Sequence, residues 1–188
     1  MAISHQDRFL NKKLLFVTGE RAEESRTRAN YNTFEIHKMD NREGIRRKRI
    51  VDAWRPVHKW KIADVWKIIE RWKINPHPCY QLGWGRCSCA CCIFSSKDQI
   101  ATLRIIQPEA FTNVLNFEKM LDQSIHYKKH GKEYSKIFLD EYANQGHSYE
   151  EMSPHLIKLI NSEEFTDPIF LENWILPKGA FADQIGPE

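Results

Sequence analysis

The segment HPCYQLGWGRCSCACCIF, residues 77–94, contains all five cysteines of the 188-residue chain, at positions 79, 87, 89, 91 and 92. Cys89 and Cys92 form a C-x-x-C pair, a spacing at which two thiolates can bind one metal from a single turn. Cys79 and Cys87 lie upstream, so three or four sulfur atoms can reach one ion or one cluster. The segment therefore predicts a metal site, and its spacing leaves zinc and iron–sulfur both open.

The residues around the cysteines suit such a site. Gly83 and Gly85 allow the backbone to turn sharply. Arg86 puts a positive charge beside the thiolates, which favours their ionised form. Ile93 and Phe94 offer an apolar cover. Two other interpretations are buried small side chains and a disulfide framework. Clustering within one short segment disfavours the first, and disulfide frameworks belong to small secreted domains.

Composition indicates a folded, globular chain. Hydrophobic residues make up 41% and aromatic residues 12%, and 188 residues suit one domain with a sizeable core. No run approaches the roughly 18 apolar residues of a membrane span, so no membrane partner is expected. The start, MAISHQDRFLNKK, lacks the apolar region of a secretory signal. With free cysteines, a cytoplasmic location is the expectation.

Charge is distributed unevenly along the chain. Residues 1–60 hold 14 Lys and Arg against 8 Asp and Glu, and residues 61–132 hold 11 against 6. Residues 133–188 reverse this balance, with 3 against 11. The first two-thirds therefore offer a surface for an anion such as a nucleotide or nucleic acid. The acidic end is either a solvated face or a surface for a basic partner.

The N-terminal region reads as the start of an α/β fold. Residues 1–13 suggest a helix, and the apolar run Leu14–Val17 ending at Thr18-Gly19 predicts a buried strand of a parallel sheet. A helix over residues 20–29 follows directly. Because α/β proteins bind ligands at the carboxyl ends of their strands, the arginines of this segment lie at a potential ligand site. Arg matches phosphate and sulfate geometry, although Glu24 and Arg28 at i, i+4 also fit a simple ion pair.

Further helices and strands are predicted from the periodicity of apolar residues and from residues that start or end such elements. An edge strand is expected at residues 33–37, and a second strand at 50–57 leads to the sheet edge. Helices are expected at 62–72, from Ser96 to about 106, from Pro108 to about 121 and at 149–162, with shorter helical stretches between 124 and 150. The apolar stripe of helix 62–72 is predicted to be core. His126, His130 and His147 are expected to be exposed, and residues beyond 168 to form a loosely docked tail.

Three motifs occur in a fixed order: GERAEES at 19–25 with Arg28, WRPVHKW at 54–60 with DVW at 64–66, and the cysteine segment. Together they resemble the C-terminal half of the phosphoadenosine phosphosulfate (PAPS) reductase family over about residues 13–125. The resemblance is greatest to the phage and mobile-element branch, which is similar to the proteins of DNA phosphorothioation systems.

The resemblance implies an adenine-nucleotide α-hydrolase-like (PP-loop) α/β fold with a helical C-terminal region. It implies that the turn at residues 19–25 faces the phosphates of ATP or the phosphate and sulfate end of PAPS. The basic run at 46–49 would flank the same cleft. The implied nucleotide-binding residues are Arg21, Ser25, Arg28, Arg46 and Arg47. A [4Fe–4S] cluster, with zinc as the alternative, is implied at Cys79, Cys87, Cys89 and Cys92.

One departure from the family pattern is large. The Ser-Gly-Gly-x-Asp-Ser phosphate loop of the family's N-terminal half is absent, and the only glycines before residue 80 are Gly19 and Gly44. We therefore expect a partial PP-loop fold lacking that half, with an exposed edge at the Leu14–Val17 strand. The missing half is expected on a separate polypeptide, and the alternative is that the present half has been re-used without nucleotide chemistry. The expected division is a family-like region at 1–125 and an acidic, helical extension at 126–188.

Three functions are compatible with these features. The first is an enzyme subunit that completes a nucleotide site with its partner and uses the cluster in sulfur transfer or reduction. The second is a zinc- or cluster-stapled module without catalysis that binds nucleic acid or protein in a phage or defence complex. The third is a sulfur carrier in which Cys91 or Cys87 is the nucleophile.

Overall fold

The computed structural model describes residues 6–149 and 152–182. The chain divides into two compact units, with the boundary between Val65 and Trp66. Helix α3 (Ile62–Arg71) begins in the first unit and ends in the second. The division expected at residue 125 separates a family-like region from an extension, and it stays a prediction. No described helix has both the length and the apolar character needed to cross a membrane.

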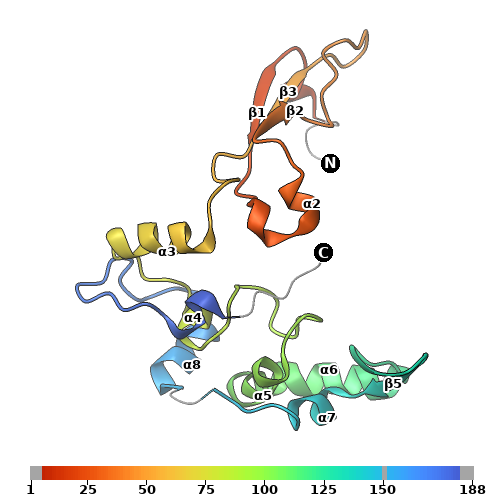
Figure 1. Cartoon of the computed structure of the whole chain (residues 1–188), viewed down its shortest axis with the longest axis vertical. Coiled ribbons are helices and arrows are strands. Elements are labelled where there is room, and N and C mark those ends of the chain that lie inside the picture. The colour runs from red at the N-terminus through yellow and green to blue at the C-terminus, as the bar shows by residue number, and fades with distance from the viewer. Residues whose placement is uncertain (1–5, 150–151, 183–188) are drawn as a thin grey trace. The chain divides into compact units, whose positions relative to one another are not determined.

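The first unit is built on a three-stranded sheet (Figure 1). Its strands are β1 (Lys13–Val17), β2 (Phe34–Ile36) and β3 (Ile50–Trp54), in the order β1-β3-β2. β1 pairs with β3 in parallel and β2 pairs with β3 antiparallel, which confirms the predicted parallel pairing and the β2 edge. β3 is central rather than leading to the edge. Pro56 lies beyond its last residue, so no ladder hydrogen bond is lost.

Strand β1 is the other edge of this sheet, and three of its four apolar side chains are exposed. Leu15 and Val17 are each 53% exposed, whereas Val51 and Ala53 of β3 are buried. The prediction that β1 is a buried strand is therefore wrong for the described residues. An apolar run specifies a strand, but burial needs a covering layer, and the described residues do not supply one for β1.

The helices expected at the N-terminus are reduced to single turns. Residues 6–12 contain only the 3₁₀ turn η1 (Asp7–Phe9), and residues 1–5 lie outside the described part. The predicted helix 20–29 is split into η2 (Ala22–Glu24) and α2 (Arg26–Ala29). The split falls at Ser25, which is extended and accepts the Arg28 N–H on its side chain, so it caps a new helix.

The second unit is mainly helical. Its helices are α4 (Pro78–Gln81), α5 (Lys97–Ile106), α6 (Pro108–Leu121), α7 (Leu139–Ala143), α8 (Pro154–Ile160) and the 3₁₀ turn η3 (Lys178–Phe181). Their core includes the fully buried Ile100, Leu103 and Leu139. Ser96 and Gln99 form a reciprocal capping box at the start of α5, and Pro108 opens α6, as the sequence predicts.

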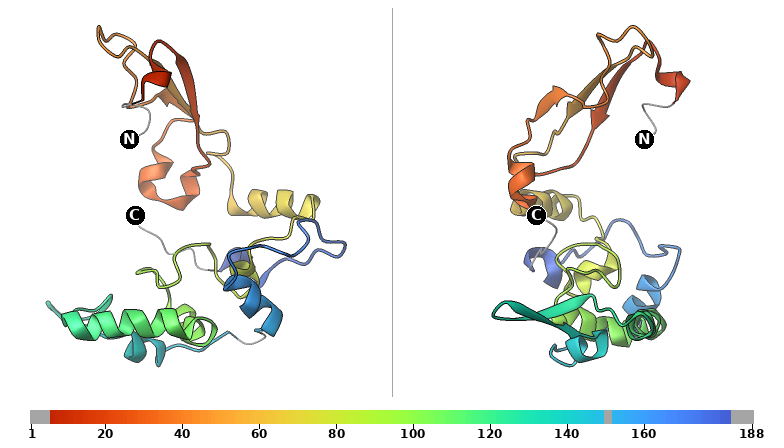
Figure 2. Two further views of the ribbon diagram at one scale, coloured as in Figure 1. Left: turned by 180° about the vertical axis from the view of Figure 1, so that it is seen from behind. Right: turned by 90° about the vertical axis from the view of Figure 1, so that its right-hand side faces the viewer.

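A β-hairpin replaces helical turns that the sequence predicts after residue 124. Strands β4 (His126–His130) and β5 (Glu133–Ile137) pair antiparallel, and Gly131 adopts a φ of 64° in the turn. Figure 2 shows the hairpin beside α6. His126 is buried and stacks on Tyr142 with ring centroids 3.7 Å apart, so its predicted exposure is wrong. Residues 150–151, within the predicted last helix, lie outside the described part.

Two predictions about packing also need correction. In α3 only Trp66 of the predicted core stripe is buried, and Trp72 is 58% exposed. The tail is not loosely docked over its described residues, because it packs on the segment before the cysteines. The Asn75 N–H donates to the Ile169 carbonyl, and the Leu171 N–H donates to the Lys73 carbonyl.

Candidate functional site

His77, Cys79 and Cys87 form the one group of potential metal ligands found among the described residues. Their ligand atoms all lie within 4.8 Å of one another. Cys79 is buried, whereas His77 and Cys87 are exposed. One imidazole and two thiols are borderline-soft donors of the kind that bind zinc and related transition metals. This group can therefore hold a metal ion.

Helix α4 positions two of the three side chains. His77 precedes the helix, and its Nδ1 accepts the Cys79 N–H at 3.2 Å, which holds the imidazole ring beside Cys79. The Cys87 N–H donates to the Tyr80 hydroxyl at 3.3 Å, so α4 also anchors the loop that carries the third ligand. Tyr80 in turn packs edge-on against Trp66 at 5.2 Å.

Gly83 makes the turn that brings Cys87 back towards α4. Its φ is 101°, in the region that side-chain-bearing residues rarely adopt. A Cβ atom at this position would also lie 3.1 Å from the Tyr149 ring. The sharp turn expected from the sequence at this glycine is therefore confirmed.

The metal-ligand group lines a cavity of about 180 Å³ with an apolar wall that includes Leu103, Ile106 and Ile160. Burial, followed by the nearby Cys87 thiol, raises the pKa of Cys79 far above its usual value. Without a metal, Cys79 is therefore a neutral thiol. A cation that replaced its proton would offset the cost of a buried thiolate.

The other cysteines lie outside this group. Cys89 is exposed and lines the same cavity. Cys91 packs against the core, and burial followed by the charge of Glu118 raises its pKa. The structure thus brings together two of the four predicted cysteine ligands and adds His77, which sequence reasoning did not assign. The spacing His-x-Cys was the available signal.

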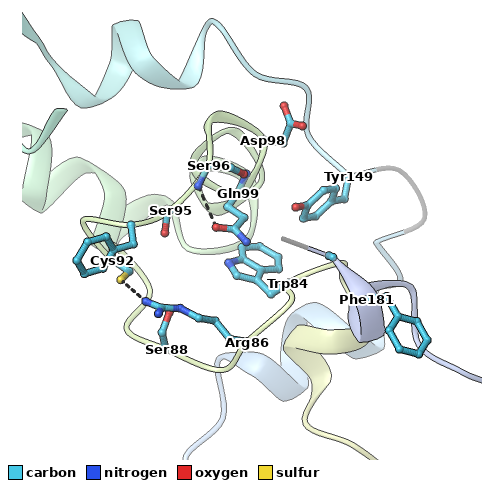
Figure 3. Close-up of a pocket in the computed structure, with 12 residues that line it drawn as sticks. Trp84, Arg86, Ser88, Cys92, Ser95, Ser96, Asp98, Gln99, Tyr149 and Phe181 are labelled. Atoms are coloured by element: carbon cyan, nitrogen blue, oxygen red, sulfur yellow. Dashed lines mark hydrogen bonds between the residues drawn. The ribbon is translucent and has the colours of Figure 1, made fainter. Parts of the chain in front are cut away.

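Cys92 lines a second cavity, of about 360 Å³. Figure 3 shows the Arg86 side chain directed at the Cys92 sulfur, while Ser96 and Gln99 bond each other on the opposite wall. Burial raises the pKa of Cys92, but hydrogen bonds from the Phe94 backbone, Arg86 and Ser88 outweigh it, and the net pKa lies below its usual value. Cys92 is therefore the cysteine best prepared to react as a thiolate.

Residues 19–28 of the first unit form the arginine turn, in which Arg21 and Arg28 make ion pairs with carboxylates of the same segment. Arg21 is 7% exposed and contacts Glu23 at 2.9 Å and Glu24 at 3.4 Å. Glu24 also binds Arg28 at 2.6 Å, which is the ion pair expected from their spacing. Ser25 caps α2 rather than pointing a free hydroxyl at a ligand. An anion that binds this turn must therefore compete with carboxylates already in place.

The WRPVHKW motif supports this turn. Arg55 is buried between Glu20 and Glu35, at 2.6 and 2.8 Å. His58 hydrogen-bonds the Arg28 carbonyl through Nε2 at 2.9 Å, and its own carbonyl accepts the Ala22 N–H at 2.8 Å. Sequence reasoning quoted this motif without assigning roles to its residues, because its partners lie 20 to 36 positions away and only the fold identifies them.

The basic run at 46–49 is split between two environments. Arg46 is exposed, and its side chain makes no hydrogen bond or ion pair with a described residue. Arg47 has a φ of 54° and contacts Asp7 at 2.9 Å. Arg49 is buried and donates to the carbonyls of Met39 and Arg47. Only part of this run is therefore free to contact a ligand.

These features define a mixed α/β protein with a small sheet, a paired arginine turn and a His–Cys–Cys group able to hold a metal. Residues 3–95 match the family described as the phosphoadenosine phosphosulfate reductase domain. This match supports assignment to the PAPS reductase family, and its span includes both the arginine turn and all five cysteines. Comparison with curated proteins and with solved structures found no match.

Proposed function

We propose that this chain is a subunit of a PAPS-reductase-like enzyme of sulfur transfer or reduction, which binds an adenine nucleotide and holds a metal centre. The observation that carries the proposal is that the metal-ligand group lies within the family-matched region. Sulfur chemistry suits a site in which thiols and a metal ion are close together, because thiolates bind soft metals and sulfur groups alike.

The nucleotide would bind at the arginine turn by replacing the carboxylate that now pairs with Arg21 and Arg28. Arg28 has a 43% exposed side chain, and its present partner Glu24 also serves Arg21. A phosphate or sulfate offers both arginines a bidentate acceptor with more charge than one shared carboxylate. Arg46 would add a further positive charge, as the family resemblance implies.

A phosphate loop would come from outside these 188 residues, on a partner polypeptide. Strand β1 supports this part of the proposal. It is an edge strand, and Leu15, Phe16 and Val17 are exposed on it. A soluble sheet edge with such side chains is suited to pairing with another strand, since backbone groups and apolar surface are then satisfied together.

The arrangement of the cysteines bears on the [4Fe–4S] cluster that the family resemblance implies. A [4Fe–4S] cluster uses four cysteine thiolates as its usual ligands. The described arrangement gathers two thiols and one imidazole, while Cys92 is engaged by Arg86 elsewhere. This arrangement fits a single metal ion better than a cluster, so no step of the proposed function is assigned to a cluster.

The nucleotide part is tested on the complex purified from its native host without oxygen. A partner bearing the Ser-Gly-Gly-x-Asp-Ser loop is expected, and calorimetry on the complex measures the binding of ATP and PAPS. Arg21→Ala and Arg28→Gln are each expected to weaken binding at least about 10-fold, as loss of a charge-assisted contact implies. Arg26→Gln, on the exposed side of α2, is the matched control. If the wild type and all three variants bind ATP and PAPS with equal affinity, the arginine turn is not part of the nucleotide site.

A second candidate function is a metal-stapled module that binds nucleic acid. It is favoured by the exposed Arg46, Arg47 and Lys48 in the loop between β2 and β3. Binding of a duplex should then weaken steeply as salt rises, because each neutralised phosphate releases a counterion. Arg46→Gln together with Lys48→Gln should reduce that salt dependence. Tight binding that is independent of salt would contradict this function.

A further inference from the structure

We propose that His77, Cys79 and Cys87 form a mononuclear Zn²⁺ site with three protein ligands and a fourth position open to the adjoining cavity. This inference deepens the metal part of the proposed function, which leaves the type of metal open. It selects one metal ion over a cluster and adds a histidine to the ligand set. Its test needs neither nucleotide nor partner.

The separation of the three side chains is close to what zinc requires. Zinc–sulfur bonds of about 2.3 Å in a tetrahedron place two sulfur ligands about 3.8 Å apart. The present ligand atoms lie within 4.8 Å of one another without a metal. Zinc bonds place a nitrogen and a sulfur ligand about 3.5 Å apart, so closing the site needs a contraction of at most about 1.3 Å. His77 and Cys87 are exposed, so their side chains can make this adjustment without disturbing the core around Cys79.

The surroundings hold the ligands in place. Nδ1 of His77 accepts the Cys79 N–H, which holds the imidazole beside Cys79, and a bound metal would take a ring lone pair in exchange for this hydrogen bond. The Tyr80 hydroxyl accepts the Cys87 N–H, and Tyr80 is itself packed on Trp66. Cys79 is fixed by burial. Cys79 and Cys87 therefore each have a support that remains when a metal binds, as metal sites need for affinity.

The number of ligands indicates an open coordination position. Among the described residues, no fourth His, Cys, Asp or Glu joins the group at this separation. Three protein ligands plus water or substrate is the pattern of catalytic zinc, whereas structural zinc has four protein ligands. The group lines a cavity whose other walls include Arg86 and Cys89. A small anionic ligand is the class that this open position would accept.

Two of the three remaining cysteines have other contacts. Cys92 is bonded by Arg86 at 3.2 Å, in a different cavity. Cys91 packs against the core with the carboxylate of Glu118 nearby. Cys89 is exposed at the edge of the metal-ligand cavity and is the one thiol that a loop movement would bring in as a fourth ligand. The experiment must therefore test Cys89 separately.

The test is titration of the full-length chain, prepared without metal under reducing conditions, with Co²⁺ and then Zn²⁺. Co²⁺ reports its ligands through thiolate charge-transfer absorption and through visible bands whose intensity identifies tetrahedral coordination. One equivalent is expected to bind, and Zn²⁺ is expected to displace it. Cys87→Ser and Cys79→Ser should each reduce the charge-transfer absorption by about half, since one of two thiolates is lost. His77→Ala should weaken binding by more than about 100-fold.

Matched controls make the same chemical changes nearby. Cys89→Ser, Cys91→Ser and Cys92→Ser should leave the spectrum and affinity unchanged, and so should His147→Ala, which removes an exposed imidazole. Adding azide to the Co²⁺ protein should shift the visible bands, because an open position can bind an anion. Cys87→Ser is the decisive variant, since its side chain is exposed and the substitution leaves the core unchanged.

Three outcomes would overturn the inference. Iron with acid-labile sulfide in anaerobically purified protein, lost on Cys89→Ser or Cys92→Ser, would indicate a cluster. Loss of Co²⁺ thiolate absorption in Cys89→Ser would indicate four protein ligands. Equal Co²⁺ affinity in wild type and Cys87→Ser would mean that no such site exists. A chain that binds Zn²⁺ as expected while its complex binds no nucleotide would retain this inference and contradict only the proposed nucleotide site.

Discussion

Nη2 of Arg86 lies 3.2 Å from the sulfur of Cys92, within hydrogen-bonding distance of a thiolate. The two residues are six positions apart in the cysteine loop and line the same cavity. A fixed guanidinium at this distance stabilises the ionised sulfur, and the partly buried position of the Arg86–Cys92 pair reduces screening by water. Cys92 and the metal-ligand group therefore give the loop two chemically different kinds of sulfur.

Removing Arg86 should make Cys92 less reactive at neutral pH. Arg86→Ala removes one hydrogen bond and the positive charge that together lower the pKa of this thiol. We expect the rate of Cys92 alkylation by iodoacetamide at pH 7 to fall several-fold in this variant and to recover as pH rises. Mass spectrometry of the modified peptide measures the rate at each cysteine.

Cys91 provides the internal control for this experiment. Burial and Glu118 raise its pKa, so it should react slowly in both proteins. Cys92→Ser should abolish the fast phase of alkylation. Faster modification of Cys91 than of Cys92 in the wild-type chain would contradict the assignment.

Arg55 should be the most important ion-pairing residue of the first unit. Its hydrogen bonds hold the pKa of Glu20 and Glu35 below their usual values, and it also donates to the Asn32 carbonyl. Because both carboxylates are about one-third exposed, we expect Arg55→Ala to cost about 2 kcal/mol, below the range for fully buried pairs. Hydrogen exchange of the β3 amides measures this loss, and Arg26→Ala should change it by less than about 0.5 kcal/mol.

Glu118 should stabilise the second unit through two backbone contacts. Its side chain is buried, and its two oxygens accept the N–H groups of Ile125 and Leu139 at 2.8 and 2.7 Å. Glu118→Ala leaves both donors without their acceptor, and we expect a loss of about 2–4 kcal/mol in unfolding free energy. Denaturant unfolding measures it. Glu109→Ala, on the exposed first turn of α6, should cost less than about 1 kcal/mol.

His126 should make the second unit sensitive to mild acid. Burial lowers its pKa below the ordinary value of about 6.5, and its Nε2 has no partner among the described residues. A proton therefore binds the unfolded state more readily than the folded state. Stability is full above about pH 6.5 and falls as pH drops towards the folded-state pKa, by at most about 1.4 kcal/mol per pH unit.

The substitution His126→Phe should remove this dependence while keeping a ring on Tyr142, which it stacks against. Thermal unfolding followed between pH 5 and pH 8 compares the variant with wild type. His147→Gln, which alters an exposed imidazole, should retain the wild-type profile. The same slope in wild type and His126→Phe would show that another group is responsible.

Local signals predicted much of the secondary structure. The Ser96–Gln99 capping box and Pro108 mark the start of α5 and α6, because capping depends on residues three or four positions apart. The hairpin after residue 125 was missed, although Gly131 marks its turn. Its strands carry few apolar residues, so the period-two pattern was weak. Short polar segments such as 6–13 were overestimated as helix, because a single turn has little stability of its own.

For the candidate sites too, local patterns predicted some features and missed those that depend on the fold. The cysteine spacing predicted a metal site at Cys79, Cys87, Cys89 and Cys92, and the folded loop groups Cys79 and Cys87 with His77. Ligand choice depends on which side chains the loop turns inward, and this follows from contacts such as Cys87 to Tyr80 and Arg86 to Cys92. Likewise the arginine turn was predicted as a cationic surface, whereas in the folded chain Glu23 and Glu24 form ion pairs with Arg21.

The sequence by itself determined the residue types available for chemistry, the clustering of all five cysteines and the order of the family motifs. These are properties of neighbours along the chain, and covalent connectivity keeps them together in any conformation. Only the tertiary structure decided that β1 is an exposed edge, that Arg55 joins Glu20 to Glu35, and that His77 shares a group with Cys79 and Cys87. Such contacts depend on how the backbone turns and on what each side chain gains by burial or pairing, which no local pattern specifies.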